Sequence, residues 1–337
     1  MQTDNSSVLE NPEYASAVQF NEVHQGYDLE SLPSWVSDNI DQARVYGYKN
    51  KCVILPDGRK YHLANSLNDL TGREWTYFIN SVFTTSYPTN GKESYAHHIR
   101  KIHPTPKPPQ LMRDLIKFFT KENEFVFDSF MGVGGTLLGA AMCNRKAAGI
   151  DLNPEYIEAY VAAARELNLA VFPTECGNTL SLLKNTKTIN RLTNSENISM
   201  LLIDPPYSNM MSKEKTGADV TVYGKTSTPF SKSKEDLGNM DRSMFLSSLK
   251  ESVELILPYM KFRGYIIIFI KDLQPRKKEL NMLHAEVVSA LNEIPNLYYK
   301  GMKIWADTST KLYPYGYPFS FVANQIHQYI LVFRKEK

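Results

Sequence analysis

Residues 201–207 read LLIDPPY, and this stretch decides the fold. A short apolar run predicts a buried strand, which the two prolines must end because proline has no N–H to give a sheet ladder. Pro206 also restricts Pro205 to an extended conformation. The result is a stiff corner in which the Asp204 carboxylate, the Pro205 carbonyl and the Tyr207 ring face the opening beyond a strand end. Ligands bind at that place in open α/β sheets.

This corner suits one chemical problem. The exocyclic amine of adenine or cytosine is a weak nucleophile, because its lone pair is delocalised into the ring. Two acceptors that take both N–H groups would draw the nitrogen towards tetrahedral geometry, and Asp204 and the Pro205 carbonyl can do this while Tyr207 stacks on the base. The alternative is that Asp-Pro-Pro-Tyr is only a strand-terminating turn, since Asp and Pro are common in turns.

Composition narrows the class of protein. The chain has 337 residues, a net charge of +2 and 42% hydrophobic residues, which are ordinary values for a folded globular protein. No apolar run is long enough to span a bilayer, and the first residues do not read as a signal peptide, so no membrane association is expected. Three scattered cysteines show neither metal-site spacing nor even pairing. They predict no metal site and fit a reducing cytoplasm. Basic clusters at 92–107, 213–234 and 271–278 weakly favour an anionic partner.

A second strand–turn–helix unit lies upstream of the Asp204 corner. Residues 124–128 predict a buried strand, and the glycine-rich stretch 129–136 follows it before a helix. A glycine-rich turn is weak evidence by itself, but the next strand, 147–151, ends in Asp151. An acid at this place binds a ribose diol in Rossmann-like sheets.

Two further positions each have two interpretations. Asn178 follows a strand expected at about 169–174, and it either hydrogen-bonds a nucleobase edge or caps the following helix. The proline-rich loop 103–109 opens a helix, and its Thr105 and Lys107 either belong to an ordinary helix start or hold a carboxylate.

The element order predicts the architecture. The chain reads as β-α-β-α-β-α-β-α-β-α-β-β, which predicts an α/β protein with a parallel sheet and a hairpin at one edge. Residues 1–45 are expected to form an arm, and 46–61 a small hairpin around Pro56-Asp57-Gly58. The later elements are expected as a helix from 154 to 167, a helix capped by Asp241 up to 257, a strand at 264–270, a helix at 280–293 and final strands at 298–305 and 326–333.

At this point the motifs resemble a family. Over residues 102–334 the chain is similar to the S-adenosylmethionine-dependent amino-methyltransferases of DNA, the N6-adenine and N4-cytosine group. Residues 204–207 (DPPY) resemble its catalytic motif, 127–136 (FDSFMGVGGT) its cofactor motif, and 103–108 (HPTPKP) its loop for the methionine moiety. The motif order resembles one circular class of the family. Ser129 departs from the pattern, because the family usually has Pro there.

The resemblance implies an architecture and a set of site residues. The fold would be Rossmann-like, with a mostly parallel seven-stranded sheet, a C-terminal antiparallel hairpin and a small N-terminal accessory region. Residues 1–100 would form the arm and accessory region, and 101–337 the methyltransferase domain with substrate-facing loops at 208–240 and 306–324. The implied catalytic residues are Asp204, Pro205, Pro206 and Tyr207. The implied cofactor-binding residues are Thr105, Lys107, Asp128, Phe130, Gly132, Gly134, Asp151, Leu152 and Asn178, with Ile150 also beside the adenine.

The implied activity is methyl transfer from S-adenosylmethionine to N6 of a flipped-out adenine in double-stranded DNA. Three alternatives stay open: the same reaction on N4 of cytosine, a protein or RNA amino-methyltransferase, and a DNA-binding subunit with a decayed pocket. Asp204 favours adenine, because cytosine members of the family more often begin the motif with Ser. The recognition sequence, the oligomeric state and a restriction or defence-system partner are not readable from the sequence.

Overall fold

The computed structural model describes residues 18–23, 29, 32–207, 231, 233–272 and 281–337. The chain divides into two compact units, which are described separately. The first comprises Met1–Asn80 with Lys117–Glu122, and the second comprises Ser81–Ile116 with Asn123–Lys337. The expected division at residues 100 and 101 concerns function and stays a prediction. The part of the chain that the structure describes contains no helix both long and apolar enough to cross a membrane.

The first unit contains a small antiparallel sheet with the order β1-β2-β3-β4. Its strands are β1 (Val18–Gln19), β2 (Arg44–Tyr46), β3 (Cys52–Ile54) and β4 (Lys60–His62). Antiparallel pairing of β3 with β4 confirms the hairpin predicted around the Pro-Asp-Gly turn. One face of the sheet buries Val45, Val53 and Tyr61 in a common core.

Short helices accompany this sheet: α2 (Phe20–Val23), η3 (Ile40–Gln42), η4 (Tyr48–Asn50), α3 (Ser34–Ser37) and α4 (Gly72–Phe78). The sequence explains where α4 begins. The Thr71 side chain accepts the Glu74 N–H, and the Glu74 carboxylate accepts the Thr71 N–H. This reciprocal capping satisfies backbone donors that the first helical turn leaves unpaired.

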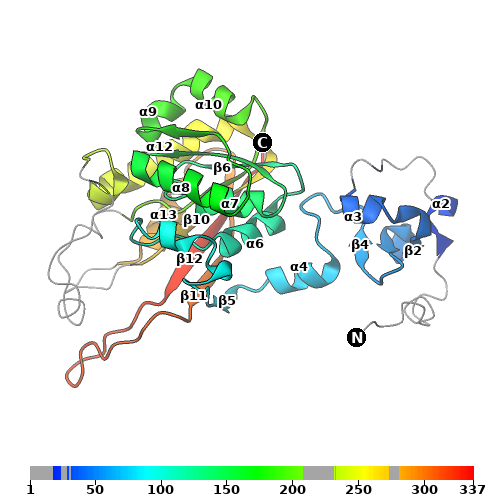
Figure 1. The fold of residues 1–337 in the computed structure, drawn as a ribbon, viewed down its shortest axis with the longest axis horizontal. Coiled ribbons are helices and arrows are strands. Elements are labelled where there is room, and N and C mark those ends of the chain that lie inside the picture. The colour runs from blue at the N-terminus through cyan, green and yellow to red at the C-terminus, as the bar shows by residue number, and fades with distance from the viewer. Residues whose placement is uncertain (1–17, 24–28, 30–31, 208–230, 232, 273–280) are drawn as a thin grey trace. The chain divides into compact units, whose positions relative to one another are not determined.

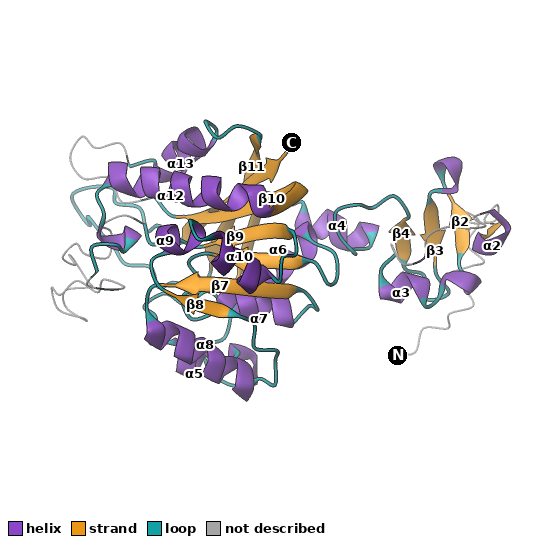
Figure 2. Cartoon of the chain, turned by 90° about the horizontal axis from the view of Figure 1, so that it is seen from above, coloured by secondary structure: helices purple, strands orange, loops and turns teal. Residues whose placement is uncertain are grey.

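The second unit is built on an eight-stranded sheet with the order β5-β11-β12-β10-β9-β6-β7-β8. Figure 2 shows its strands lying side by side beneath α12. The strands are β5 (Val82–Thr85), β6 (Phe125–Asp128), β7 (Lys146–Asp151), β8 (Thr174–Cys176), β9 (Ile198–Ile203), β10 (Met260–Ile270), β11 (Leu297–Asp307) and β12 (His327–Lys335). Only β12 runs antiparallel to its neighbours, β10 and β11. The predicted α/β fold with a mostly parallel sheet and a C-terminal antiparallel hairpin is confirmed.

Two details differ from the sequence-based expectation. An eighth strand, β5, pairs in parallel with β11 at the sheet edge. The strand expected at 169–174 lies later, because Thr174 is the first residue in register with β7, opposite Gly149. Phe172 gives its N–H to the Tyr160 hydroxyl instead of to a sheet ladder.

Helices cover both faces of this sheet. They are η5 (Lys92–Ser94), α5 (His97–Arg100), α6 (Pro109–Phe119), α7 (Gly135–Ala141), α8 (Pro154–Glu166), α9 (Thr179–Leu183), α10 (Thr186–Thr193), η7 (Leu237–Asn239), α12 (Arg242–Ile256), η8 (Leu257–Tyr259) and α13 (Leu283–Leu291). The Asp241 carboxylate accepts the Met244 N–H, which confirms the predicted cap of α12.

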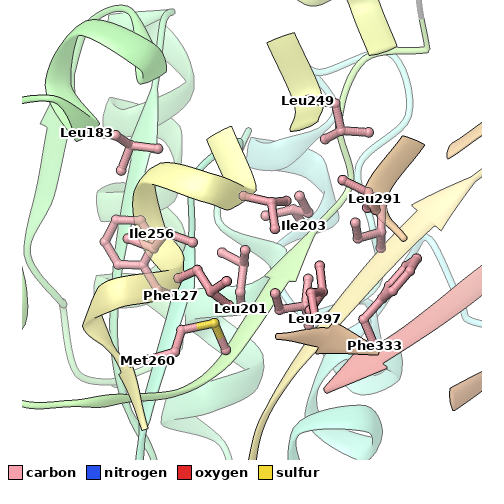
Figure 3. Packing of buried hydrophobic residues seen from close by; sticks show 14 of the residues in the cluster. Phe127, Leu183, Leu201, Ile203, Leu249, Ile256, Met260, Leu291, Leu297 and Phe333 are labelled. Carbon is pink, nitrogen blue, oxygen red and sulfur yellow. The ribbon is translucent and has the colours of Figure 1, made fainter. Parts of the chain in front are cut away.

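The main core lies between the sheet and one layer of helices. Phe127, Leu201 and Ile203 of neighbouring strands pack with Leu183 of α9 and Ile256 of α12 (Figure 3). Alternate strand residues point to the other face of the sheet, where α7 and α8 contact β7. Because both faces are covered, the central strands are apolar throughout, and their polar residues gather at their ends.

Some expectations fall outside the described residues. These are most of the polar connection 208–240 and of the basic loop 271–278. Of the first, Ser231 and 233–240 are described and include η7.

Candidate active site

Three carboxylates lie at the carboxyl ends of adjacent parallel strands. Asp128 and Asp151 are the last residues of β6 and β7, and Asp204 directly follows β9. In the sheet order β9-β6-β7 these strands are neighbours, so the three side chains are brought to one edge.

A cavity of about 290 Å³ opens at this edge. It is lined by eleven of the thirteen predicted site residues: Thr105, Lys107, Phe130, Gly132, Asp151, Leu152, Asn178, Asp204, Pro205, Pro206 and Tyr207. Asp128 and Gly134 are not in its wall. Ile150, expected beside the adenine, is fully buried in the main core and does not line the cavity either. The two ambiguous loops, around Lys107 and Asn178, thus reach the same space as the Asp204 corner.

The Asp204 carboxylate is held from two sides. Its Oδ2 accepts a hydrogen bond from Lys107 Nζ at 2.5 Å, and its Oδ1 accepts one from the Tyr207 hydroxyl at 2.6 Å. The ion pair is largely shielded, with 8% of the Lys107 side chain and 17% of the Asp204 side chain exposed. Burial, then the neighbouring Asp204 charge, raises the pKa of Tyr207 well above its ordinary value, so the phenol stays protonated and remains a donor.

These contacts modify the roles predicted for two residues. Lys107 was expected at the methionine end of the cofactor, and in this structure its ammonium binds Asp204. Tyr207 was expected to stack on a base, and in this structure it is buried with its hydroxyl directed at Asp204. Both side chains line the cavity, so the predicted contacts with ligands remain predictions.

The glycine-rich turn after β6 is organised by the carboxylates of Asp128, which is buried, and of Asp151, which is partly exposed. Asp128 accepts the Phe130 N–H at 3.0 Å, while Asp151 Oδ2 accepts the Gly132 N–H at 2.8 Å. Burial raises the pKa of Asp128 to about 7, although its bonds to Phe130 and Thr136 oppose this shift. Asp128 therefore shapes the turn from behind the cavity wall.

Gly134 shows why this turn needs glycine. Its φ is +74°, in the left-handed region, and a Cβ there would lie 2.2 Å from the Tyr160 ring. Neither condition suits a residue with a side chain. Gly134 lets the turn pack directly on α8, and so its role is in the fold of the turn.

Asp151 combines a structural bond with an exposed acceptor face. Its Oδ1 accepts the Asn153 N–H at 2.8 Å, and Oδ2 is held by the turn. A carboxylate has about four lone-pair positions, and the Leu152 N–H also bonds to this carboxylate, so about one position remains for a ligand in the cavity. Burial raises the pKa of Asp151 to about 6 against the opposing effect of these backbone bonds.

For Asn178 the structure supports the capping interpretation. Its Oδ1 accepts the Ser181 N–H at 2.9 Å and so caps α9. The neighbouring Thr179 hydroxyl donates to the Ser129 carbonyl at 2.7 Å, which ties α9 to the glycine-rich turn. The side chain of Asn178 nevertheless lines the cavity, so its contact with a nucleobase stays a prediction.

Several cavity residues were not singled out from the sequence. The His103 ring packs edge-on against Tyr156 with centroids 4.9 Å apart, and burial lowers its pKa to about 4, so it is neutral near pH 7. Lys271, after β10, has its pKa lowered by burial and then by Lys107. Gln328 of β12 places Oε1 3.4 Å from the Tyr207 hydroxyl. His103 had a sequence signal as the first residue of the HPTPKP loop and Lys271 as the first residue of the basic cluster 271–278, whereas Gln328 had none.

A second cavity of about 260 Å³ adjoins the first. Thr105, Lys107 and Gln328 line both cavities, and Trp305 and Asp307 of β11 line only the second. The Asp204–Lys107 pair therefore lies close to the wall that separates two ligand-sized spaces.

Part of this site lies in a region that is similar to known proteins. The DNA methylase family of the N6/N4 type matches residues 42–163, which include the HPTPKP loop, the glycine-rich turn and Asp151. Over these residues the chain is similar to the N6/N4 DNA methylase family. The Asp204 corner lies beyond the matched residues.

The chain is also similar to several type II methyltransferases. The type II methyltransferase M1.MboII of Moraxella bovis is 30% identical over 131 residues, which are 39% of this chain and 45% of that protein. The type II methyltransferase M.HpaI of Haemophilus parainfluenzae is 41% identical over 133 residues, 37% of this chain and 42% of that protein. M2.DpnII of Streptococcus pneumoniae is 35% identical over 124 residues, 37% of this chain and 38% of that protein. The chain thus spans less than half the length of each of these relatives.

Similarity to this family implies S-adenosylmethionine as cofactor. The main cavity fits the chemistry of this molecule. It offers the Asp151 carboxylate to a ribose diol, the apolar side chains of Phe130 and Leu152 to a base, and the Lys107 ammonium to a carboxylate. The turn also approaches the HPTPKP loop closely, since a Cβ at Gly135 would lie 2.9 Å from the Lys107 carbonyl oxygen.

Proposed function

We propose that this protein transfers a methyl group from S-adenosylmethionine to N6 of an adenine rotated out of double-stranded DNA. One observation carries the proposal: Asp204 faces the same cavity as Gly132 and Asp151. A group that accepts amine protons therefore lies beside the residues suited to hold the methyl donor.

Each end of the cofactor has a proposed partner. Asp151 would bind the ribose hydroxyls, and Leu152, Phe130 and Asn178 would surround the adenine. Thr105 and Lys107 would bind the methionine end, where Lys271 also contributes positive charge. The bound cofactor supplies an electrophilic methyl group on a cationic sulfur, and the protein supplies position and electrostatics.

At the reacting amine, Asp204 and the Pro205 carbonyl would each accept one N–H. Pro206 holds Pro205 extended, which keeps that carbonyl directed outward. Held by these two acceptors, the amine nitrogen would direct its lone pair at the methyl group that the bound cofactor supplies. The methylated nitrogen is positively charged and loses a proton to Asp204 or to water.

In this scheme, Tyr207 and Lys107 set the orientation and the charge balance of the Asp204 carboxylate. The Tyr207 hydroxyl fixes the carboxylate orientation through its 2.6 Å bond, and Lys107 compensates its charge before the amine arrives. Fixed donors of this kind hold an acceptor in its productive orientation without reorganisation during the reaction.

The reaction is tested with the purified full chain, S-adenosylmethionine labelled in its methyl group, and plasmid DNA from a methylation-deficient host. The treated DNA is digested to nucleosides, and the modified base is identified by mass. N6-methyladenine is the expected product. N4-methylcytosine would refute the adenine assignment, and incorporation into protein or RNA alone would refute the DNA assignment.

Cofactor binding is measured separately by calorimetry. Binding without methyl incorporation into DNA would support a DNA-binding subunit over an enzyme. Because relatives are type II methyltransferases, we also propose a restriction-modification setting. In that setting, methylated plasmid resists a nuclease with the same recognition sequence.

A further inference from the structure

The connection between β11 and β12 extends away from the sheet as a long hairpin, coloured orange to red in Figure 1. Because β12 runs antiparallel to both β11 and β10, and β10 runs parallel to β9, β11 ends at the edge of the sheet where the Asp204 corner lies, and the hairpin leaves the sheet there. Its foot belongs to the site. Gln328, the second residue of β12, lines the main cavity, and Trp305 and Asp307 line the adjoining one.

The far end of the hairpin exposes aromatic side chains, which we call the aromatic tip: Tyr317, Phe319 and Phe321. Phe319 is 93% exposed and Phe321 92%, the highest values among the exposed large apolar residues of the described chain. Single exposed apolar residues are normal, but several grouped on one projecting element indicate an interaction site.

The tip is held by a specific set of bonds. Asn324 clamps Tyr313 across the hairpin, accepting its N–H at 2.8 Å and donating to its carbonyl at 2.7 Å. Beyond the clamp, the Phe319 N–H bonds to the Gly316 carbonyl at 2.7 Å. Gly316 has a φ of +77°, and a Cβ there would lie 2.4 Å from the Ser320 carbonyl oxygen. The backbone therefore closes a tight turn that keeps the phenylalanine rings in solvent.

The foot of the hairpin is anchored as well. The Trp305 indole N–H donates to the Thr85 hydroxyl at 2.6 Å, and the Thr308 N–H bonds to the Thr85 carbonyl at 2.9 Å. Strand β5 thus fixes the point from which the hairpin leaves the sheet.

The charge of the hairpin suits a polyanion. Residues 308–326 contain one charged residue, Lys311, and neither Asp nor Glu. Flat, uncharged rings at the end of an element without acidic groups can stack on bases while the phosphates pass on either side. A hydrophobic protein partner would use the rings equally well, but continuity with the Asp204 edge favours DNA as the occupant.

We propose that the aromatic tip inserts Phe319 and Phe321 into the base stack of the DNA substrate beside the target nucleotide. The inference rests on the proposed function and adds a specific task to it. Rotating a base out of a duplex costs a few kcal/mol in lost stacking and pairing. Rings that fill the gap replace part of the lost stacking and stabilise the open duplex.

The proposal predicts a dependence on base pairing. Substituting both rings with alanine should weaken binding to a duplex with a normally paired target by about 10- to 100-fold, the effect expected for lost aromatic stacking. A duplex whose target lies opposite an abasic site has already lost that pairing. Its affinity should fall by less than about threefold.

The experiment uses the full chain and short duplexes that carry the site mapped from methylated DNA, or a random-sequence duplex if no methylated site is found. Affinities of F319A/F321A and the wild type are measured with 2-aminopurine at the target position, whose fluorescence reports unstacking. F319W/F321W keeps large rings and should restore binding. The matched control is F262A, which removes a 59% exposed phenylalanine at the opposite end of β10.

The outcomes separate the two proposals. Equal losses of affinity on the paired and abasic duplexes would overturn the proposed insertion into the base stack, as would an unchanged affinity or a wild-type protein that binds no duplex. So would a wild-type dimer that F319A/F321A turns into a monomer, because the tip would then serve a second copy. Failure of the proposed function is seen independently, as absent methyl incorporation by the wild type.

Discussion

The two ends of the central sheet use charged residues differently. At the amino ends, Glu124 before β6 pairs with Lys261 of β10, and Lys146 at the start of β7 pairs with Glu196 before β9 at 2.6 Å. Each cation there has one acidic partner, and the pairs are partly exposed. At the carboxyl ends, the charges of Asp204 and Asp151 add to the effect of burial in raising the pKa of Asp128.

This difference shows at which end of the sheet the fold accepts the free-energy cost of burying ionised groups. Burial raises the pKa of Asp128 and of Asp151, so keeping these groups ionised near neutral pH disfavours the folded state. The surface pairs at the amino ends carry no such cost and contribute little to stability. Desolvated acids in a cavity are typical of functional sites, whereas simple pairs are typical of loop anchoring.

The largest expected effect is on catalysis. Asp204→Asn should lower methyl transfer by about 10³-fold, because one acceptor of the amine protons loses its charge. Cofactor affinity should change by less than about fivefold, since Asp151 and the glycine-rich turn are untouched. Single-turnover methyl transfer and calorimetry measure the two quantities. Equal losses in both would mean that Asp204 serves the cofactor instead of the amine.

The next effect is on folding. Gly134→Ala should lower the free energy of unfolding by about 2–5 kcal/mol, from a left-handed backbone and a collision with the Tyr160 ring. Urea denaturation followed by circular dichroism gives the value. Gly91→Ala is the matched control, because Gly91 also has a positive φ but no atom lies within 4 Å of its would-be Cβ. A similar loss of stability in both variants would mean that the positive φ causes it and that the collision with the Tyr160 ring adds nothing.

A smaller effect concerns pH. The pKa of Asp151 is about 6 in the folded protein and 3.8 in the unfolded chain. Between these two pH values the folded protein keeps the proton on Asp151, while the unfolded chain releases it. The contribution of this carboxyl to stability is therefore present at low pH and is lost as the pH rises from about 4 to 6.

Cofactor binding should follow the opposite trend. A diol needs the ionised acceptor, so affinity should fall up to about tenfold per pH unit below pH 6. Calorimetry between pH 5 and pH 8 measures this. Asp151→Asn should bind more weakly with a flat profile, while Asp128→Asn should keep the wild-type profile. A flat wild-type profile would remove Asp151 from the site.

The smallest effect is expected at the amino ends. Lys146→Ala breaks a partly exposed pair and should cost less than about 1 kcal/mol. Methyl transfer and cofactor affinity should not change. A loss of activity here would show that the two ends of the sheet are coupled through β7.

Residue patterns predicted much of this molecule. The apolar runs that end in Asp128, Asp151 and Asp204 predicted three neighbouring strand ends, and the structure brings two of those acids and the glycine turn to one cavity. The prediction worked because parallel strands buried on both faces have no polar positions except at their ends. It was wrong for the strand expected at 169–174, because local apolarity does not state which residues will be in register with β7.

Sequence alone therefore determined the fold class and the strand ends, since each follows from short-range rules on proline, glycine and apolar runs, and it carries the motifs that resemble the DNA methylase family. Only the tertiary structure decided which residues pair with one another. Lys107 and Asp204 are 97 positions apart in the sequence, and Tyr207 and Gln328 are 121 positions apart. The exposure of the aromatic tip was likewise decided by the tertiary structure. The sequence shows that the rings are present, but it does not show whether they are buried in a core. Long-range packing determines burial and pairing, and no local pattern encodes it.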